Sequence, residues 1–219
     1  MKLNYTDITI ILDRSGSMNS IADATIAGFN EFVDEQALLP GEVKLSLIQF
    51  NTGREVTFTA APVREVPHLH AGNYRPSGGT ALLDAVALTI DATGQRLASL
   101  VEDDRPSKVI VAILTDGLEN QSWQFNYSQV RERIGRQKEV YQWDFVFLGA
   151  KQDAIAEAAK LSIGADNALT FGASAKGAKA AFKALSKSAG DAHTGKKGKA
   201  EFDLLDRLEQ DGEIKWGSK

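Results

Sequence analysis

The 219-residue sequence contains no cysteine, which excludes disulfide bonds and metal sites built on thiolates. It contains no apolar run of membrane-spanning length, and the acidic Asp7 interrupts the stretch where a signal peptide would lie. Charge of neither sign dominates, since the formal net charge is −4, and nucleic-acid binding usually needs a basic face. These absences predict a cytoplasmic protein that binds neither membranes nor nucleic acid.

What the sequence does contain is enough apolar material for a substantial core, with 43% hydrophobic and 25% charged residues. We expect one folded domain over residues 1–189. From residue 190 the composition shifts to Gly, Lys, Asp and His, which predicts a C-terminal tail over 190–219. This tail is expected either to be flexible or to dock on the domain, with a short amphipathic helix built on Phe202, Leu204, Leu205 and Leu208.

Residues 8–12 and 109–114 are two apolar runs rich in β-branched side chains, as in parallel strands covered on both faces. A short turn at 51–53 joins predicted strands at 43–50 and 55–61, which must therefore be antiparallel. Further strands are expected at 143–148 and 168–171, and helices at 18–36, 81–102, 128–139, 152–161 and 175–188. This alternation predicts a doubly wound α/β fold: a mostly parallel sheet with one reversed edge strand and helices on both faces.

Three oxygen side chains follow the first apolar run at alternate positions. They belong to Asp13, Ser15 and Ser17, and Gly16 allows a tight bend between them. A carboxylate and two hydroxyls, without thiol or imidazole, favour a hard divalent cation such as Mg²⁺, Mn²⁺ or Ca²⁺. In the alternative interpretation, Ser15 or Ser17 caps the helix that follows.

Two later segments add oxygen ligands of the same kind. Thr80 follows paired glycines at the start of a predicted helix, where its hydroxyl either binds a ligand or forms the N-cap. The second apolar run ends at Asp116, as the first ends at Asp13. If these strands are neighbours, the two carboxylates repel each other unless a cation lies between them; otherwise each is a plain turn residue.

The irregular stretch at 62–79 carries His68 and His70. A zinc site would need three or four convergent ligands, and Glu65 is the only obvious further one nearby. We therefore expect both histidines to be solvated loop residues.

Taken together, residues 13–17, 78–80 and 114–117 resemble the three-part metal-ion-dependent adhesion site (MIDAS) of von Willebrand factor A (VWA) domains. The resemblance covers roughly residues 5–189. It implies a Rossmann-like sheet of six strands in the order 3-2-1-4-5-6 with one antiparallel edge strand. It also implies that Ser15, Ser17 and Thr80 bind Mg²⁺ through their hydroxyls, and that Asp13 and Asp116 bind it directly or through water.

In this family, an Asp or Glu of a partner protein often completes the coordination of the metal. The lack of cysteine and of a secretory signal makes the sequence most similar to intracellular, stand-alone members of bacteria and their phages. Some of those work as adaptors for AAA+ ATPases or other intracellular complexes. The oligomeric state is left open.

The function that we expect is a divalent-metal-dependent protein-binding module that captures a partner carboxylate. One alternative is a structural subunit of a larger assembly. A metal-dependent hydrolase is less favoured, because the sequence contains no Gly-x-Ser-x-Gly elbow and neither His68 nor His70 lies in a catalytic motif. We therefore expect no enzyme activity.

Overall fold

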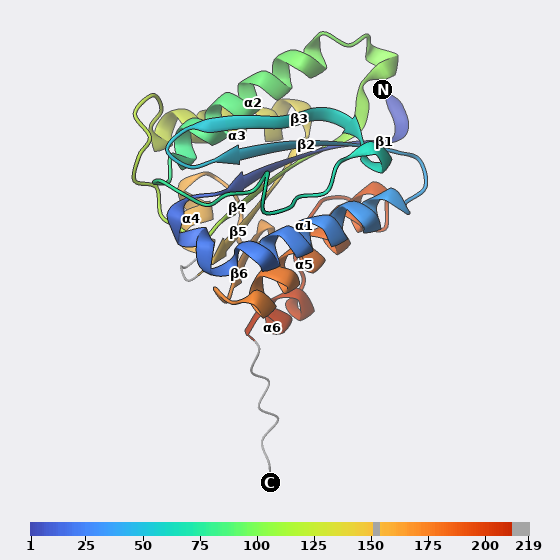
Figure 1. Ribbon diagram of the computed structural model, residues 1–219. Coiled ribbons are helices and arrows are strands. Elements are labelled where there is room, and N and C mark those ends of the chain that lie inside the picture. The colour runs from blue at the N-terminus through green and yellow to red at the C-terminus, as the bar shows by residue number, and fades with distance from the viewer. Residues whose placement is uncertain (151–153, 212–219) are drawn as a thin grey trace.

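The computed structural model describes residues 1–150 and 154–211, with side chains placed up to residue 207. Its centre is one six-stranded sheet in the order β3-β2-β1-β4-β5-β6 (Figure 1). All neighbouring strands are parallel except β2 and β3. The predicted sheet order and the reversed edge strand are thus confirmed. The strands are β1 (Lys2–Asp13), β2 (Glu42–Phe50), β3 (Arg54–Pro62), β4 (Pro106–Thr115), β5 (Asp144–Ala150) and β6 (Ala168–Phe171).

Helices cover both faces of the sheet, as predicted (Figure 1). Helices α1 (Ala22–Ala37) and α5 (Ala175–His193) pack on one face, and α2 (Leu82–Ala98), α3 (Tyr127–Tyr141) and α4 (Ala154–Lys160) on the other. Within the described ranges, no helix is both long and apolar enough to span a bilayer.

Strand β1 shows why its sequence is apolar at successive positions. Ile8, Ile10 and Leu12 belong to the core beneath α1 and α5, whereas Ile11 belongs to the core beneath α2 and α3. Alternate side chains of a strand point to opposite faces of the sheet. A strand covered on both sides must therefore be apolar at nearly every position.

Strand β1 also begins at Lys2, well before the apolar run at 8–12, and it includes a fully buried Asp7. The guanidinium of Arg96 on α2 donates hydrogen bonds of 2.9 and 2.8 Å to the two carboxylate oxygens of Asp7. This bidentate pairing satisfies a carboxylate inside the sheet. The partners are 89 residues apart, so the sequence around Asp7 gives no sign of it.

Several predicted helices have different bounds in the structure, and α2 ends at Ala98 rather than at the predicted residue 102. Residues Gly16–Ile21 form a 3₁₀ helix, and α1 begins only at Ala22. Helix α5 continues to His193 and so crosses the predicted domain boundary at residue 190; the division into 1–189 and 190–219 stays a prediction. The start of the helix predicted at 152–161 falls outside the described residues.

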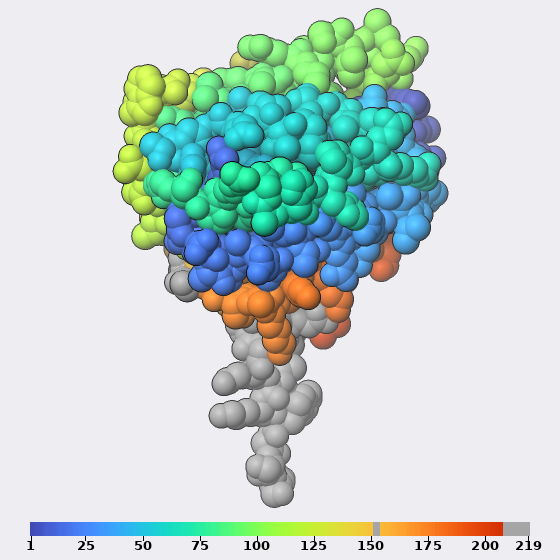
Figure 2. All heavy atoms as spheres, in the orientation of Figure 1, coloured from blue at the N-terminus to red at the C-terminus, as the bar shows by residue number. Residues whose placement is uncertain are grey.

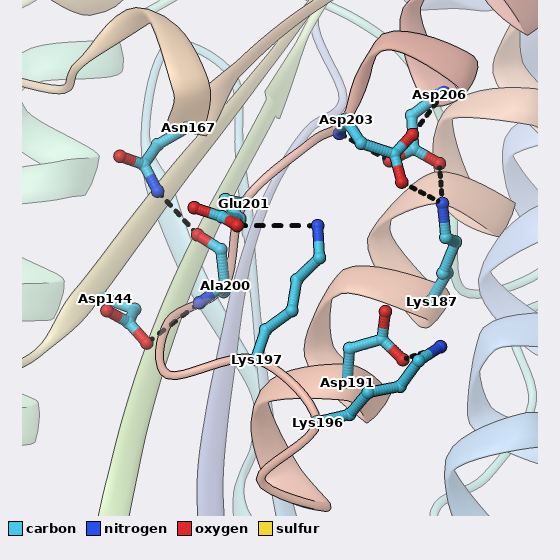
Figure 3. A network of polar contacts seen from close by, with 10 residues as sticks. All are labelled: Asp144, Asn167, Lys187, Asp191, Lys196, Lys197, Ala200, Glu201, Asp203 and Asp206. Atoms are coloured by element: carbon cyan, nitrogen blue, oxygen red, sulfur yellow. Dashed lines mark hydrogen bonds and ion pairs between the residues drawn. The ribbon is translucent and has the colours of Figure 1, made fainter.

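The segment after α5 packs against the domain (Figure 3). The amide of Ala200 donates to the Asp144 carboxylate at 3.1 Å, and the side chain of Phe202 is buried in the core. Lys187 on α5 pairs with Asp203 at 2.7 Å and with Asp206 of α6 (Leu204–Asp211) at 2.8 Å. These contacts tie the segment both to β5 and to α5.

We expect Phe202→Ala to lower the free energy of unfolding by about 3 kcal/mol, because it leaves a cavity in the core. Urea titration followed by circular dichroism measures this change. The matched control is Leu205→Ala, whose side chain is 67% exposed and whose loss should cost less than about 0.5 kcal/mol. Equal stability of both variants would contradict the packing of this segment.

Candidate metal centre

The register of the two central strands brings Asp13 and Asp116 together. Leu12 of β1 lies level with Leu114 of β4, so Asp13 is level with Thr115, and Asp116 is the next residue along. Both strands run parallel, and their carboxyl ends therefore meet at one edge of the sheet, where open α/β sheets hold their ligands. The two carboxylates reach this edge from adjacent strands, as predicted.

A chain of hydrogen bonds links four of the predicted ligand residues. The Ser15 amide donates to Oδ1 of Asp13 at 2.6 Å. The hydroxyl oxygens of Ser15 and Ser17 are 3.1 Å apart, and Ser17 donates to Oδ1 of Asp116 at 2.5 Å. Asp13, Ser15 and Asp116 are buried, whereas Ser17 is exposed, so the cluster opens to solvent on the side of Ser17.

Thr80 faces the same point from the loop at 77–80. A β-carbon built on Gly117 would lie 3.1 Å from Oγ1 of Thr80 and 3.7 Å from Oγ of Ser17. The loop itself is held against the β1 turn, since Gly78 accepts a hydrogen bond of 3.0 Å from the Gly16 amide. Gly78 has a φ of +75°, and a β-carbon there would lie 2.6 Å from the Thr52 hydroxyl. A glycine at position 78 is therefore required for this close approach.

The capping alternatives for these hydroxyls find no support in the described residues. Ser15 is the N-cap of the 3₁₀ helix, but its hydroxyl makes no capping hydrogen bond. The N-cap of α2 is Ala81, not Thr80. Both hydroxyls are therefore left for the cluster between Asp13 and Asp116.

One carboxylate oxygen of this cluster lacks a partner. Oδ2 of Asp116 is buried and accepts no hydrogen bond within the described part of the chain, although a buried charged oxygen normally has a donor or a cation beside it. Two carboxylates and three hydroxyls offer only oxygen atoms, which are the ligands that Mg²⁺ and Ca²⁺ prefer. The five residues fit a hard divalent cation; that each is a ligand stays a prediction.

The surroundings of Asp13 change the pKa of its carboxyl group. Burial raises its pKa to about 6, while hydrogen bonds donated by the Thr115 hydroxyl and by Ser15 act in the opposite direction. The nearby charge of Asp116 raises it further. A cation bound here would favour the ionised form of Asp13.

Three residues that sequence reasoning missed support this cluster. The Thr115 hydroxyl donates to Oδ2 of Asp13 at 2.5 Å, and the buried Tyr74 donates from its hydroxyl to the backbone oxygen of Asp13 at 2.7 Å. Oδ1 of Asn120 accepts from the Thr80 amide at 2.9 Å. Only Thr115, which directly precedes Asp116, had a visible signal; Tyr74 and Asn120 lie in loops without a recognisable pattern.

The two loop histidines take part in no metal cluster. His68 lies 3.0 Å from the Asp34 carboxylate, and the His70 ring accepts from the Gly72 amide at 3.0 Å. Within the described residues, no group of three or more His, Cys, Asp or Glu side chains is placed to hold a metal ion. A cation site in this part of the chain therefore needs ligands besides these four residue types, and the hydroxyls of Ser15, Ser17 and Thr80 are candidates.

Neither a family model nor a curated protein sequence matches the chain. Among solved structures, proximal thread matrix protein 1 of the mussel byssus has a TM-score of 0.59 at 15% identity, over 85% of this chain and 46% of that one. The von Willebrand factor domain of the pilus tip protein Mfa5 from Porphyromonas gingivalis has a TM-score of 0.56 at 12% identity, over 84% and 94%.

A von Willebrand factor type A structure from Catenulispora acidiphila also matches, with a TM-score of 0.55 at 15% identity over 85% of this chain. This chain has the VWA fold. It spans 46% of the mussel protein and 42% of the Catenulispora protein. The VWA fold places the carboxyl ends of β1 and β4 side by side, and it is at this edge that Asp13 and Asp116 meet.

We expect Thr115→Val to weaken Mg²⁺ binding about tenfold, because Asp13 loses a hydrogen bond that orients its carboxylate. Isothermal titration calorimetry measures the affinity. Thr9→Val is the matched control: Thr9 is also buried in the sheet, and its hydroxyl has no partner in the described residues. A loss of affinity in both variants, or in neither, would contradict the role assigned to Thr115.

The stabilisation by Mg²⁺ should depend on pH through Asp13. The pKa of Asp13 is about 6 in the fold, against an ordinary value of 3.8. In the window between pH 3.8 and about 6, the folded, metal-free protein therefore loses stability as the pH rises, because ionising this buried carboxyl costs more in the fold than in the unfolded chain. A cation offsets that cost above the window and competes with a proton within it. We expect saturating Mg²⁺ to raise Tm clearly near pH 7.5 and only slightly near pH 5.

Differential scanning calorimetry at both pH values, with and without EDTA, measures the effect. Asp13→Asn should abolish the Mg²⁺-dependent rise at both pH values. An equal rise at both pH values in the unchanged protein would exclude Asp13 as the titrating group.

Proposed function

We propose that this chain is a divalent-metal-dependent protein-binding module. In this proposal Asp13, Ser15, Ser17, Thr80 and Asp116 hold the cation, as a complete MIDAS. The observation that carries it is the buried Oδ2 of Asp116, which has no hydrogen-bond partner among the described residues, beside four further oxygen side chains. A buried carboxylate oxygen without a hydrogen-bond donor is stabilised by a positive charge beside it.

The proposed cation is Mg²⁺, with Mn²⁺ or Ca²⁺ as alternatives, because all five side chains offer hard oxygen atoms. One structure of the mussel byssus protein has a zinc-occupied MIDAS motif, which supports a divalent metal at the equivalent edge of this sheet. When bound, the metal supplies a Lewis-acidic position that an acidic side chain of a partner can occupy. Because the three hydroxyls are neutral ligands, they do not cancel the positive charge of the cation, which can therefore still attract that carboxylate.

The arrangement of the site favours binding over catalysis. All three histidines of the sequence make their contacts elsewhere: His68 with Asp34, His70 with Gly72, and His193 with Thr6 and Pro40. General acid–base catalysis needs such a group within hydrogen-bond reach of the substrate. We therefore propose a module without enzyme activity rather than a hydrolase.

The expected partner is a protein that presents an Asp or Glu. We propose that the chain acts as an intracellular, cytoplasmic adaptor of bacterial or phage type, with an AAA+ ATPase or another intracellular complex as the partner. The net charge of −4 supports a partner other than nucleic acid. The alternative is a structural subunit of a larger assembly, whose contacts would survive removal of the metal.

The experiment is an affinity capture from the source cell with immobilised protein, in Mg²⁺ and in EDTA. We expect the wild type to retain specific proteins in Mg²⁺ only, and the Asp13→Ala/Asp116→Ala variant to retain none of them. Asp34→Ala is the matched control, since Asp34 is an exposed acidic residue on α1. Replacing the partner's acidic residues by Asn or Gln should then abolish capture.

Identical captured proteins in all conditions would contradict the proposal and favour the structural subunit. Calorimetry with Mg²⁺ alone is the accompanying measurement. Metal binding that the double variant retains would exclude Asp13 and Asp116 as ligands.

A further inference from the structure

Two large apolar side chains are exposed beside the candidate metal centre. Leu118 and Trp123, in the β4–α3 loop, are 55% and 82% exposed. Several other exposed apolar side chains lie at or just before the starts of strands, at the opposite edge of the sheet: Leu3, Leu38, Val101, Val140 and Tyr141. Leu118 and Trp123 lie instead toward the edge that carries the site, as do Val56 and Ile155, which are less exposed at 46% and 42%.

The backbone around Trp123 is fixed by one buried carboxylate. Asp84, in the first turn of α2, accepts hydrogen bonds from the amides of Trp123, Gln124 and Phe125 at 3.0, 3.1 and 2.9 Å. Three successive amides on one carboxylate leave the main chain little freedom. The fold therefore fixes the main chain at Trp123, whose side chain is exposed.

A second carboxylate fixes the preceding residues. Glu119 accepts from the amides of Leu83, Gln121 and Ser122 at 2.8, 2.9 and 2.7 Å, and also from the Ser122 hydroxyl at 2.7 Å. Oγ of Ser122 in turn accepts from the Asp84 amide at 3.0 Å. A surface ordered before binding loses less entropy when a partner docks.

The loop is also tied directly to the site. Asn120 and Thr80 exchange two hydrogen bonds. The backbone amide of Asn120 donates to the backbone carbonyl of Thr80 at 3.0 Å, and the backbone amide of Thr80 donates to Oδ1 of Asn120 at 2.9 Å. Asp84, which accepts the hydrogen bond from the Trp123 amide, lies in the first turn of α2, four residues after Thr80. Leu118 directly follows Asp116 and Gly117 in the chain. Figure 2 shows the loop, in yellow-green, protruding at the left edge of the molecule.

We propose that Leu118 and Trp123 form, together with the metal centre, the docking surface for one extended segment of the partner protein. This segment carries an Asp or Glu for the metal and, one to three residues away, a large apolar side chain that packs on Trp123. The proposal rests on the proposed function. A short spacing is proposed because Trp123 lies only three residues beyond Asn120, which hydrogen-bonds to Thr80; an extended chain advances about 3.3 Å per residue.

The metal centre and the apolar pair would have different roles in binding. A single carboxylate on a cation gives little selectivity, because every protein surface carries Asp and Glu. Tryptophan is among the residues that dominate binding energy at protein interfaces, and the main chain that carries Trp123 is ordered before binding. The acidic residue would thus secure metal dependence, and the apolar residue would select the partner.

The test uses phage-displayed octapeptides with one fixed Asp and random residues elsewhere, selected in Mg²⁺ on the whole chain. On the wild type we expect enrichment of aromatic or large aliphatic residues within three positions of the Asp. The best peptide should bind Trp123→Ser about tenfold more weakly, while both proteins bind Mg²⁺ alone equally well. Tyr141→Ser is the matched control, an exposed aromatic residue at the far end of α3.

The outcomes separate this inference from the function on which it rests. Peptides that need Asp and Mg²⁺ but show no apolar preference, or that bind Trp123→Ser at full strength, would overturn the docking surface and leave the metal-dependent module intact. A selection that yields no peptide dependent on both Asp and Mg²⁺ would overturn both proposals.

Discussion

The register between β1 and β4 is the constraint on which the site depends. Leu12 lies level with Leu114, which sets Asp13 beside Thr115 and lets the Thr115 hydroxyl donate to the buried Asp13 carboxylate. A slip by one residue would turn every side chain of a strand to the other face. The apolar side chains on both faces of β1 prevent such a slip, because each has a core to fill. The packing of the sheet thus fixes the distance between the two carboxylates.

The acidic residues near this edge divide into two kinds. Asp84 and Glu119 each accept several amide hydrogen bonds and so join the β4–α3 loop to the start of α2. Asp116 is different, because its second oxygen is buried and has no partner in the described residues. Only the second kind has an unmet need for a cation. Hydrogen bonding thus distinguishes Asp116 from Asp84 and Glu119, whereas both carboxylate oxygens of Asp13 accept hydrogen bonds.

The VWA fold is shared with a byssus matrix protein and a pilus tip domain that are at most 15% identical to this chain. Such a likeness concerns the arrangement of the sheet and helices, while function depends on the residues at the site. In this chain the candidate site consists of five oxygen side chains, and beside them a loop whose main chain is ordered around Trp123 by Asp84. The hydrogen bonds that order this loop join residues about 40 positions apart and were visible only in three dimensions, whereas docking of the C-terminal segment was one of the outcomes expected from the sequence.

Local patterns were sufficient for the strands and the reversed edge strand, because apolar runs and the turns after them are encoded within a few residues. That β1 and β4 are neighbours, so that Asp13 and Asp116 meet, was implied only by the resemblance to VWA domains. Tertiary contacts decided the rest. Asp7 sits inside β1 because Arg96 reaches it from α2, and Thr80 is free for the site because α2 begins one residue too late for it to be the cap. The exposure of Trp123 depends on Asp84, 39 residues away. Each of these features depends on a partner distant in sequence, and no local periodicity records such a partner.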